Sequence, residues 1–214
     1  MPKPLIIFDL DGTLVDSSGD LSTAVNLTRA DYGLPALSRE TVVTFIGNGL
    51  HKLMERSFDG ADVDVDEAIP KMRAHYDEHM VDTTALYPGV SAALESLRDQ
   101  GYALAVVTNK PVKPAQRICR ELGIDAYFPV VLGGDSCPNI KPHPEPLHWA
   151  LELTECGTEG SWMVGDNYTD MEAGKNAGLS RCFCTYGLGF AGDSGSELAV
   201  DNLAKFAQHV ASEQ

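Results

Sequence analysis

The chain has 214 residues, of which 43% are hydrophobic and 22% charged, so its composition is that of a folded globular protein and excludes disordered or collagen-like classes. Its 16 basic and 31 acidic residues give a net charge of −15, and we therefore expect neither nucleic acid nor a membrane surface as its main partner. The 5 cysteines form no Cys-x-x-Cys pair, which indicates reduced thiols and a cytoplasmic protein.

Short apolar runs predict strands at intervals along the chain. The first run, residues 5–8, ends at Asp9 and is too short for a signal peptide or a membrane span. Further runs lie at 103–107, 130–132, 162–164 and 182–184, with helical patterns between them. This alternation predicts an α/β fold, a parallel sheet with helices on both faces, whose ligands bind beyond the carboxyl ends of the strands.

Only helical patterns follow the first strand, and they predict an inserted helical unit over residues 17–83. We expect its hinges near 14–18 and 83–88, so that residues 1–16 and 84–214 together form the core. The tail after Gly192 is rich in glycine and serine, and a helical pattern over 196–209 follows it.

Two pairs of acidic residues follow predicted strands. Asp9 and Asp11 come directly after the first strand, and Asp166 and Asp170 follow the strand at 162–164. Each pair alone is also compatible with a solvated turn or a helix cap. At one edge of a parallel sheet, however, Asp9, Asp166 and a main-chain carbonyl would supply the hard oxygen ligands that suit Mg²⁺.

Two further strand or loop ends carry groups that suit phosphate. Thr108 and Asn109 end the strand at 103–107 and precede a helix that Pro111 opens, so hydroxyl, amide and backbone N–H groups are available there. Lys141 lies in a loop that prolines make rigid. An ordinary turn and a solvated lysine are the alternative interpretations of these two segments.

In this order and spacing, the four motifs resemble the haloacid dehalogenase superfamily of phosphohydrolases over almost the whole chain. The family's nucleophile motif stands at 9–14, its phosphate-binding threonine at Thr108, its lysine at Lys141 and its acidic motif at 165–170. The resemblance implies a Rossmann-like core with a helical cap inserted after the first motif. It also implies a Mg²⁺-dependent phosphatase that acts on a small phosphorylated substrate.

The resemblance also implies a role for each matched residue. Asp9 would attack phosphorus to form an aspartyl-phosphate, and Asp11 would act as the general acid and base. The carboxylates of Asp9 and Asp166 and the main-chain carbonyl of Asp11 would hold Mg²⁺. Thr108, Asn109 and Lys141 would bind the phosphate, and Asp170 would support Lys141 or a metal-bound water.

Five segments, at 45–50, 86–90, 108–111, 133–135 and 141–144, resemble the phosphoglycolate phosphatase branch. This resemblance implies 2-phosphoglycolate as the substrate. In the insertion, Gly47, Asn48 and Gly49 precede a helical pattern, so backbone and helix N–H groups there could bind a small carboxylate. A simple helix–helix turn is the alternative for this cap substrate loop. Sugar phosphatases and pyrophosphatases share much of the same pattern.

Other functions stay open at the level of sequence. Dehalogenases of the superfamily lack the second aspartate, so Asp11 disfavours carbon–halogen chemistry. A β-phosphoglucomutase-like phosphomutase would need a cap that binds two phosphates. A receiver-like signalling module uses a similar Asp, Thr and Lys set but has no inserted cap. A binding protein without catalysis is disfavoured because every catalytic position is present.

Overall fold

The computed structural model describes residues 3–212 and has a six-stranded sheet at its centre. The strand order is β5-β4-β1-β6-β7-β8, and every neighbouring pair is parallel. The strands are β1 (Pro4–Phe8), β4 (Ala103–Val107), β5 (Val130–Leu132), β6 (Gly157–Gly165), β7 (Ser180–Cys184) and β8 (Leu198–Val200). Because β4 and β6 flank β1 on opposite sides, the strand order reverses at β1, where α/β sheets bind ligands.

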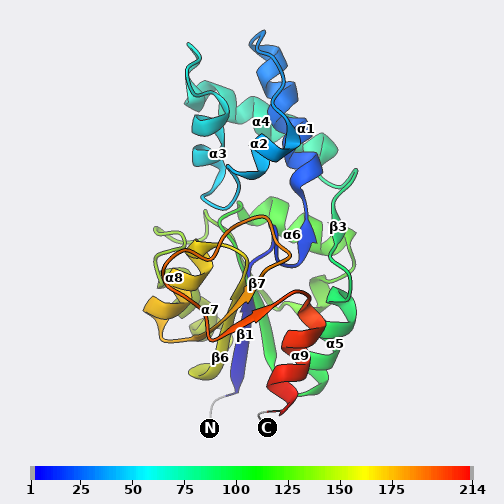
Figure 1. Ribbon diagram of the computed structural model, residues 1–214, viewed down its shortest axis with the longest axis vertical. Helices are drawn as coiled ribbons and strands as arrows, with labels where there is room; N and C mark the ends of the chain where they lie inside the picture. Colours follow the sequence, from blue (N-terminus) through cyan, green and yellow to red (C-terminus); the bar gives the residue numbers. More distant parts are fainter. Residues whose placement is uncertain (1–2, 213–214) are drawn as a thin grey trace.

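Helices cover both faces of this sheet (Figure 1). Alternate residues of β1 point to opposite faces, so Ile6 and Phe8 join one buried cluster and Leu5 and Ile7 join the other. The first cluster contains residues of α5 (Val90–Asp99), α6 (Val112–Glu121) and α9 (Leu203–Ser212), near the 3₁₀ turn η1 (Asp125–Tyr127). The second contains α7 (Glu145–Leu153) and α8 (Tyr168–Ala177). The predicted fold class is confirmed.

Four helices form a separate lobe above the sheet, and we call this lobe the cap (Figure 1). They are α1 (Ser18–Asp31), α2 (Arg39–Val43), α3 (Leu50–Ser57) and α4 (Val65–His79). Val25, Met54 and Met72 are fully buried between them, which explains the helical spacing of apolar residues in this segment. The helical insertion is therefore confirmed, while the boundaries at 17 and 83 stay predictions.

Two short connections join the cap to the core, and the buried carboxylate of Asp20 links them through hydrogen bonds. The strands β2 (Val15–Asp16) and β3 (Ala85–Leu86) pair in antiparallel fashion at this junction. Asp20 in α1 accepts hydrogen bonds from the backbone N–H and hydroxyl groups of both Thr83 and Thr84. Burial alone would raise the pKa of Asp20, but these hydrogen bonds outweigh it and lower the pKa.

The tail differs from the prediction made for it. Residues 198–200 form the edge strand β8, so the helix expected over 196–209 is wrong at its start and begins at Leu203. The run of Leu198, Ala199 and Val200 is compatible with a helix or a strand. It forms a strand because it pairs with β7. Across residues 3–212 the longest helices are too short or too polar to cross a membrane.

Candidate active site

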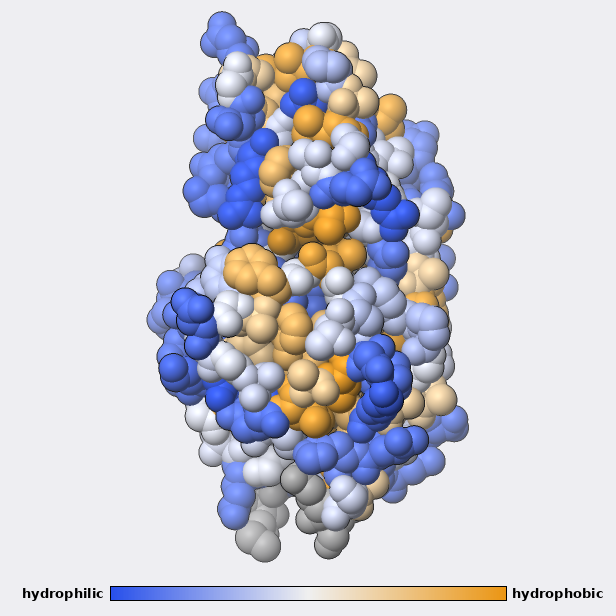
Figure 2. Space-filling view, viewed as in Figure 1, coloured by the Kyte–Doolittle hydropathy of each residue, from blue (hydrophilic) through white to orange (hydrophobic). Residues whose placement is uncertain are grey.

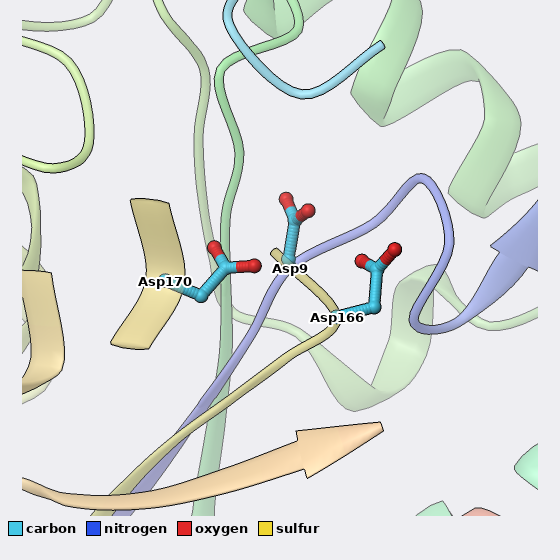
Figure 3. Close-up of side chains that lie close together, drawn as sticks. All are labelled: Asp9, Asp166 and Asp170. Carbon is cyan, nitrogen blue, oxygen red and sulfur yellow. The ribbon is translucent and has the colours of Figure 1, made fainter. Parts of the chain in front are cut away.

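Three carboxylates converge at the carboxyl edge of the sheet (Figure 3). Asp9 follows β1, Asp166 follows β6, and Asp170 lies in the first turn of α8. All three are buried, and one oxygen atom from each lies within 4.8 Å of the others. The prediction that strand-end acids far apart in sequence lie together is confirmed.

Neighbouring loops fix the position of Asp166. Its Oδ1 accepts a 3.0 Å hydrogen bond from the Thr13 hydroxyl, and its Oδ2 accepts from the backbone N–H groups of Leu188 and Gly189 at 2.8 and 2.9 Å. Gly12 has a φ of +87°, and a Cβ there would lie 2.2 Å from Asp166 Oδ2. A glycine is therefore required for the turn of the first motif to approach Asp166.

Lys141 connects two of the three carboxylates. Its ammonium lies 2.9 Å from Asp9 Oδ1 and 2.7 Å from Asp170 Oδ1, and it also donates to the carbonyl of Val107 at 2.6 Å. The other Asp170 oxygen accepts from the backbone N–H of Asn167 at the start of α8. Burial alone would lower the pKa of Lys141, but Asp170 and Asp9 outweigh it and raise the pKa.

The charge of this cluster suits a bound cation. Burial, reinforced by Asp9 and Asp170, raises the pKa of Asp166 to about 8. Asp9 Oδ1 lies beside Lys141, yet among the described residues it accepts no hydrogen bond of good geometry. Three buried carboxylates beside a single lysine leave an excess of negative charge, which fits a small divalent cation with oxygen ligands such as Mg²⁺.

The side chain of Asp11 points to a different partner. Both of its carboxylate oxygens accept 2.9 Å hydrogen bonds from the Lys110 ammonium, and Oδ1 also accepts from the Ser17 hydroxyl. The carboxylate of Asp11 is thus outside the three-carboxylate cluster, and only its main-chain carbonyl remains in the predicted metal set. Lys110 directly follows Thr108 and Asn109 in a segment of the predicted resemblance, but no role was predicted for its side chain.

Thr108 and Asn109 lie at the end of β4, where they were expected. The Asn109 side chain, however, forms hydrogen bonds within the protein. Its amide donates to the carbonyls of Gly47 and Lys141 at 2.9 Å each, and its oxygen accepts from the backbone N–H of Lys141 at 3.0 Å. These bonds hold the lysine loop in place. Phosphate binding by Asn109 stays a prediction that rests on its backbone N–H. Thr108 is buried and lines the cavity described below.

The cap loop of Gly47, Asn48 and Gly49 contacts the core. Besides the bond from Asn109 to Gly47, the Asn48 amide donates to the Tyr168 hydroxyl at 2.8 Å. Arg56 of α3 donates to Asn48 Oδ1 at 2.9 Å and so fixes the amide orientation. The loop is therefore part of the cap–core contact, and its role as a carboxylate site stays a prediction.

A cavity of about 300 Å³ lies between cap and core. On the face shown in Figure 2, apolar side chains gather where the two lobes meet. The cap contributes mainly apolar lining residues, which are Leu21, Ile46, Leu50, Leu53, Met72 and Tyr76. The core contributes the polar and charged residues Asp9, Asp11, Thr108, Asn109 and Lys110. Four further charged residues, Arg73, Asp77, Lys113 and Asp135, complete this set.

The loop after β7 is a part of the site that the sequence analysis missed. Its Leu188 and Gly189 N–H groups bind Asp166, and a Cβ at Gly187 would lie 2.2 Å from Asp166 Cβ. The available signal was a pair of glycines two residues apart, at the end of a strand in the same parallel sheet. Glycines of that kind indicate close approach of the backbone to another group.

Comparison with known proteins agrees with this geometry. Residues 6–184 match the family of haloacid dehalogenase-like hydrolases. The chain is 38% identical over 199 residues to the phosphoglycolate phosphatase of Colwellia psychrerythraea, covering 89% of this chain and 88% of that protein. It is 40% identical over 195 residues to the phosphoglycolate phosphatase of Haemophilus influenzae, covering 87% of each.

A solved structure has the same fold over nearly all of the chain. This is the crystal structure of a predicted phosphoglycolate phosphatase from Haemophilus somnus, which is 35% identical in sequence. The TM-score is 0.91, and the match covers 97% of both chains.

Proposed function

The chain belongs to the haloacid dehalogenase-like hydrolases, and from this premise we propose that it hydrolyses 2-phosphoglycolate to glycolate and phosphate. The observation that carries the chemistry is the buried set of Asp9, Asp166 and Asp170 around Lys141. Similarity to phosphoglycolate phosphatases over 87–89% of the chain supports the choice of substrate.

In the first step Asp9 attacks the phosphorus atom. A bond forms between its carboxylate oxygen and phosphorus, and the bond from phosphorus to the ester oxygen of the substrate breaks. Asp11 donates a proton to that oxygen, so the leaving group departs as a neutral hydroxyl. Lys110 and Ser17 fix the position of the Asp11 side chain, which must take up a proton before it can act as this acid.

In the second step water attacks the phosphorus atom of the aspartyl-phosphate. Asp11, which is now ionised, takes a proton from this water, and the Asp9 carboxylate is released together with phosphate. Lys141 and the Thr108 hydroxyl contact the phosphoryl oxygens and stabilise the charge that develops there. Asp170 holds the Lys141 ammonium between its own carboxylate and that of Asp9.

The proposed metal site comprises the carboxylates of Asp9 and Asp166 and the carbonyl of Asp11. When Mg²⁺ is bound there, it neutralises charge on the phosphoryl group as a Lewis acid. Thr13, Leu188 and Gly189 hold Asp166 in the orientation that this role requires.

Phosphate release from a small panel of substrates tests the proposal. With Mg²⁺ present, kcat/KM is measured for 2-phosphoglycolate, glycerol 3-phosphate, glucose 6-phosphate and pyrophosphate. We expect 2-phosphoglycolate to have the highest value. A clear preference for any of the other three would overturn the proposed substrate and move the chain to another branch of the same family.

A further inference from the structure

Lys110 is a buried cation that the proposed reaction uses only indirectly. Within residues 3–212 three cationic side chains are buried, namely Arg29, Lys110 and Lys141. Arg29 donates to backbone carbonyls inside the cap, and Lys141 lies among the catalytic carboxylates. Lys110, in contrast, lines the cavity between cap and core.

The Lys110 ammonium has one N–H donor that Asp11 does not use, and this donor lies beside Tyr76 at the cavity. It carries three N–H donors, and the two oxygens of Asp11 accept from two of them. The ammonium also lies 4.7 Å from the centre of the Tyr76 ring, which comes from the cap helix α4. Lys141 shows elsewhere in this site that a single buried ammonium can contact two carboxylates.

Tyr76 supplies a second unused donor beside the first. Its side chain is 6% exposed and lines the same cavity, and in the described part of the chain its hydroxyl has no hydrogen-bond partner of good geometry. The neighbouring ammonium of Lys110 has no lone pair, so it cannot accept the phenolic proton. Leaving a buried donor without an acceptor is costly, and a ligand acceptor would remove that cost.

We propose that Lys110 and Tyr76 together bind the carboxylate of the leaving group and so select phosphate esters of a short 2-hydroxy acid. This inference rests on the proposed function and assigns the residues that give the enzyme its substrate specificity. It places the substrate carboxylate at a core lysine and a cap tyrosine, a different position from the cap substrate loop at residues 47–49.

The position of Lys110 matches the shape of such a substrate. The acid Asp11 must touch the ester oxygen, and Lys110 lies 2.9 Å from both oxygens of Asp11. In 2-phosphoglycolate the carboxylate carbon is only two bonds from that ester oxygen. A cation beside the acid is therefore within reach of the carboxylate while the phosphate stays at Asp9.

Because Lys110 belongs to the core and Tyr76 to the cap, the pair exists only when the lobes are together. Six other charged residues line the cavity, namely Asp9, Asp11, Arg73, Lys113, Asp77 and Asp135. The last four of these are exposed. Of these four, two are cationic and two anionic, so their charges offset one another. Lys110 is the one buried cation among the described residues that line the cavity, and Asp11 is its only carboxylate partner there.

The test compares two substrates that differ in one group. For each variant, kcat/KM is measured for 2-phosphoglycolate and for 2-hydroxyethyl phosphate, in which an uncharged CH₂OH replaces the carboxylate. Lys110→Met should lower the ratio of the two values by roughly 10- to 100-fold, the size expected for a lost charge-assisted hydrogen bond. Lys110→Arg keeps the charge and should restore most of the ratio.

Tyr76→Phe provides a variant that keeps the ring and the fold. It removes only the phenolic hydroxyl, and the ratio should fall by about 2- to 10-fold. If Lys110 serves only to hold Asp11, Lys110→Met slows both substrates alike, because Asp11 acts on both leaving groups. An unchanged ratio in both variants would overturn the proposal.

The cap contains a matched control pair outside the cavity. Lys71 lies 4.2 Å from the centre of the Tyr32 ring, in the same kind of contact. Lys71→Met and Tyr32→Phe should leave the ratio unchanged, and a drop equal to that of the Lys110 variant would contradict a specific role for Lys110. A wild-type ratio of one or less would instead overturn the proposed substrate, so the two failures are distinguishable.

Discussion

Lys141 donates a 2.7 Å hydrogen bond to Asp170, and the exposed fractions of their side chains are only 1% and 0%. The pair spans the loop after β5 and the first turn of α8, so it joins two separate segments of the site. Asp170 is in turn fixed by the backbone N–H of Asn167. This buried ion pair therefore supports both the fold and the position of the lysine.

We expect Lys141→Met to abolish phosphatase activity and to lower the free energy of unfolding by about 3–5 kcal/mol, because it leaves buried carboxylates without their cation. The double variant Lys141→Met/Asp170→Asn should regain part of that stability in urea unfolding but none of the activity. Recovery of activity in the double variant would contradict a role for Lys141 at the phosphate.

Asp11→Asn should affect substrates according to their leaving groups. Hydrolysis of 2-phosphoglycolate should slow by roughly 10²–10⁴-fold, since its leaving oxygen needs a proton. Hydrolysis of p-nitrophenyl phosphate should slow much less, because that leaving group is a weak base. Steady-state rates of wild type and variant are measured on both esters. Equal losses on the two would rule out Asp11 as the general acid.

Activity should require Mg²⁺ and should decline when Ca²⁺ replaces it. Ca²⁺ prefers longer bonds and more ligands, so it would disturb the alignment of Asp9 with the phosphorus atom. Phosphate release is measured after chelation and after addition of each metal. Asp166→Asn should raise the Mg²⁺ concentration needed for half-maximal activity. Full activity of the chelated enzyme would refute the metal requirement.

The junction between cap and core should respond to acid through Asp20. Its pKa is lowered in the folded protein, so its contribution to stability is present above the unfolded value of about 4 and is lost as the pH falls through the folded value. Asp20→Asn should be less stable than wild type at neutral pH and should lose less stability on acidification. Urea unfolding midpoints across this pH range measure both effects. Parallel pH curves for the two proteins would contradict the assignment.

Much of the core site could be predicted because its residues directly follow apolar strands. In a parallel sheet the ends of β1, β4 and β6 meet at one edge, so Asp9, Thr108 and Asp166 had to come together. The direction of each side chain was not predictable in this way. Asp11 and Asp9 are two residues apart, yet Asp11 turns to Lys110 while Asp9 turns to Lys141.

Contacts that depend on tertiary packing were beyond the sequence patterns. The place of Tyr76 beside Lys110 follows from how α4 packs over the core, and no local motif encodes that geometry. The tail strand β8 forms because β7 offers an unpaired edge, whereas its own three residues suit a helix equally well.

The covalent role of Asp9 is the central claim, and it is tested most directly by Asp9→Asn. The amide has nearly the same shape, but it neither attacks phosphorus nor binds Mg²⁺ as a carboxylate does. With circular dichroism confirming the fold, the rate of phosphate release from 2-phosphoglycolate in the presence of Mg²⁺ is compared with that of wild type. We predict a loss of roughly 10³-fold or more. Turnover close to the wild-type rate would contradict the aspartyl-phosphate mechanism.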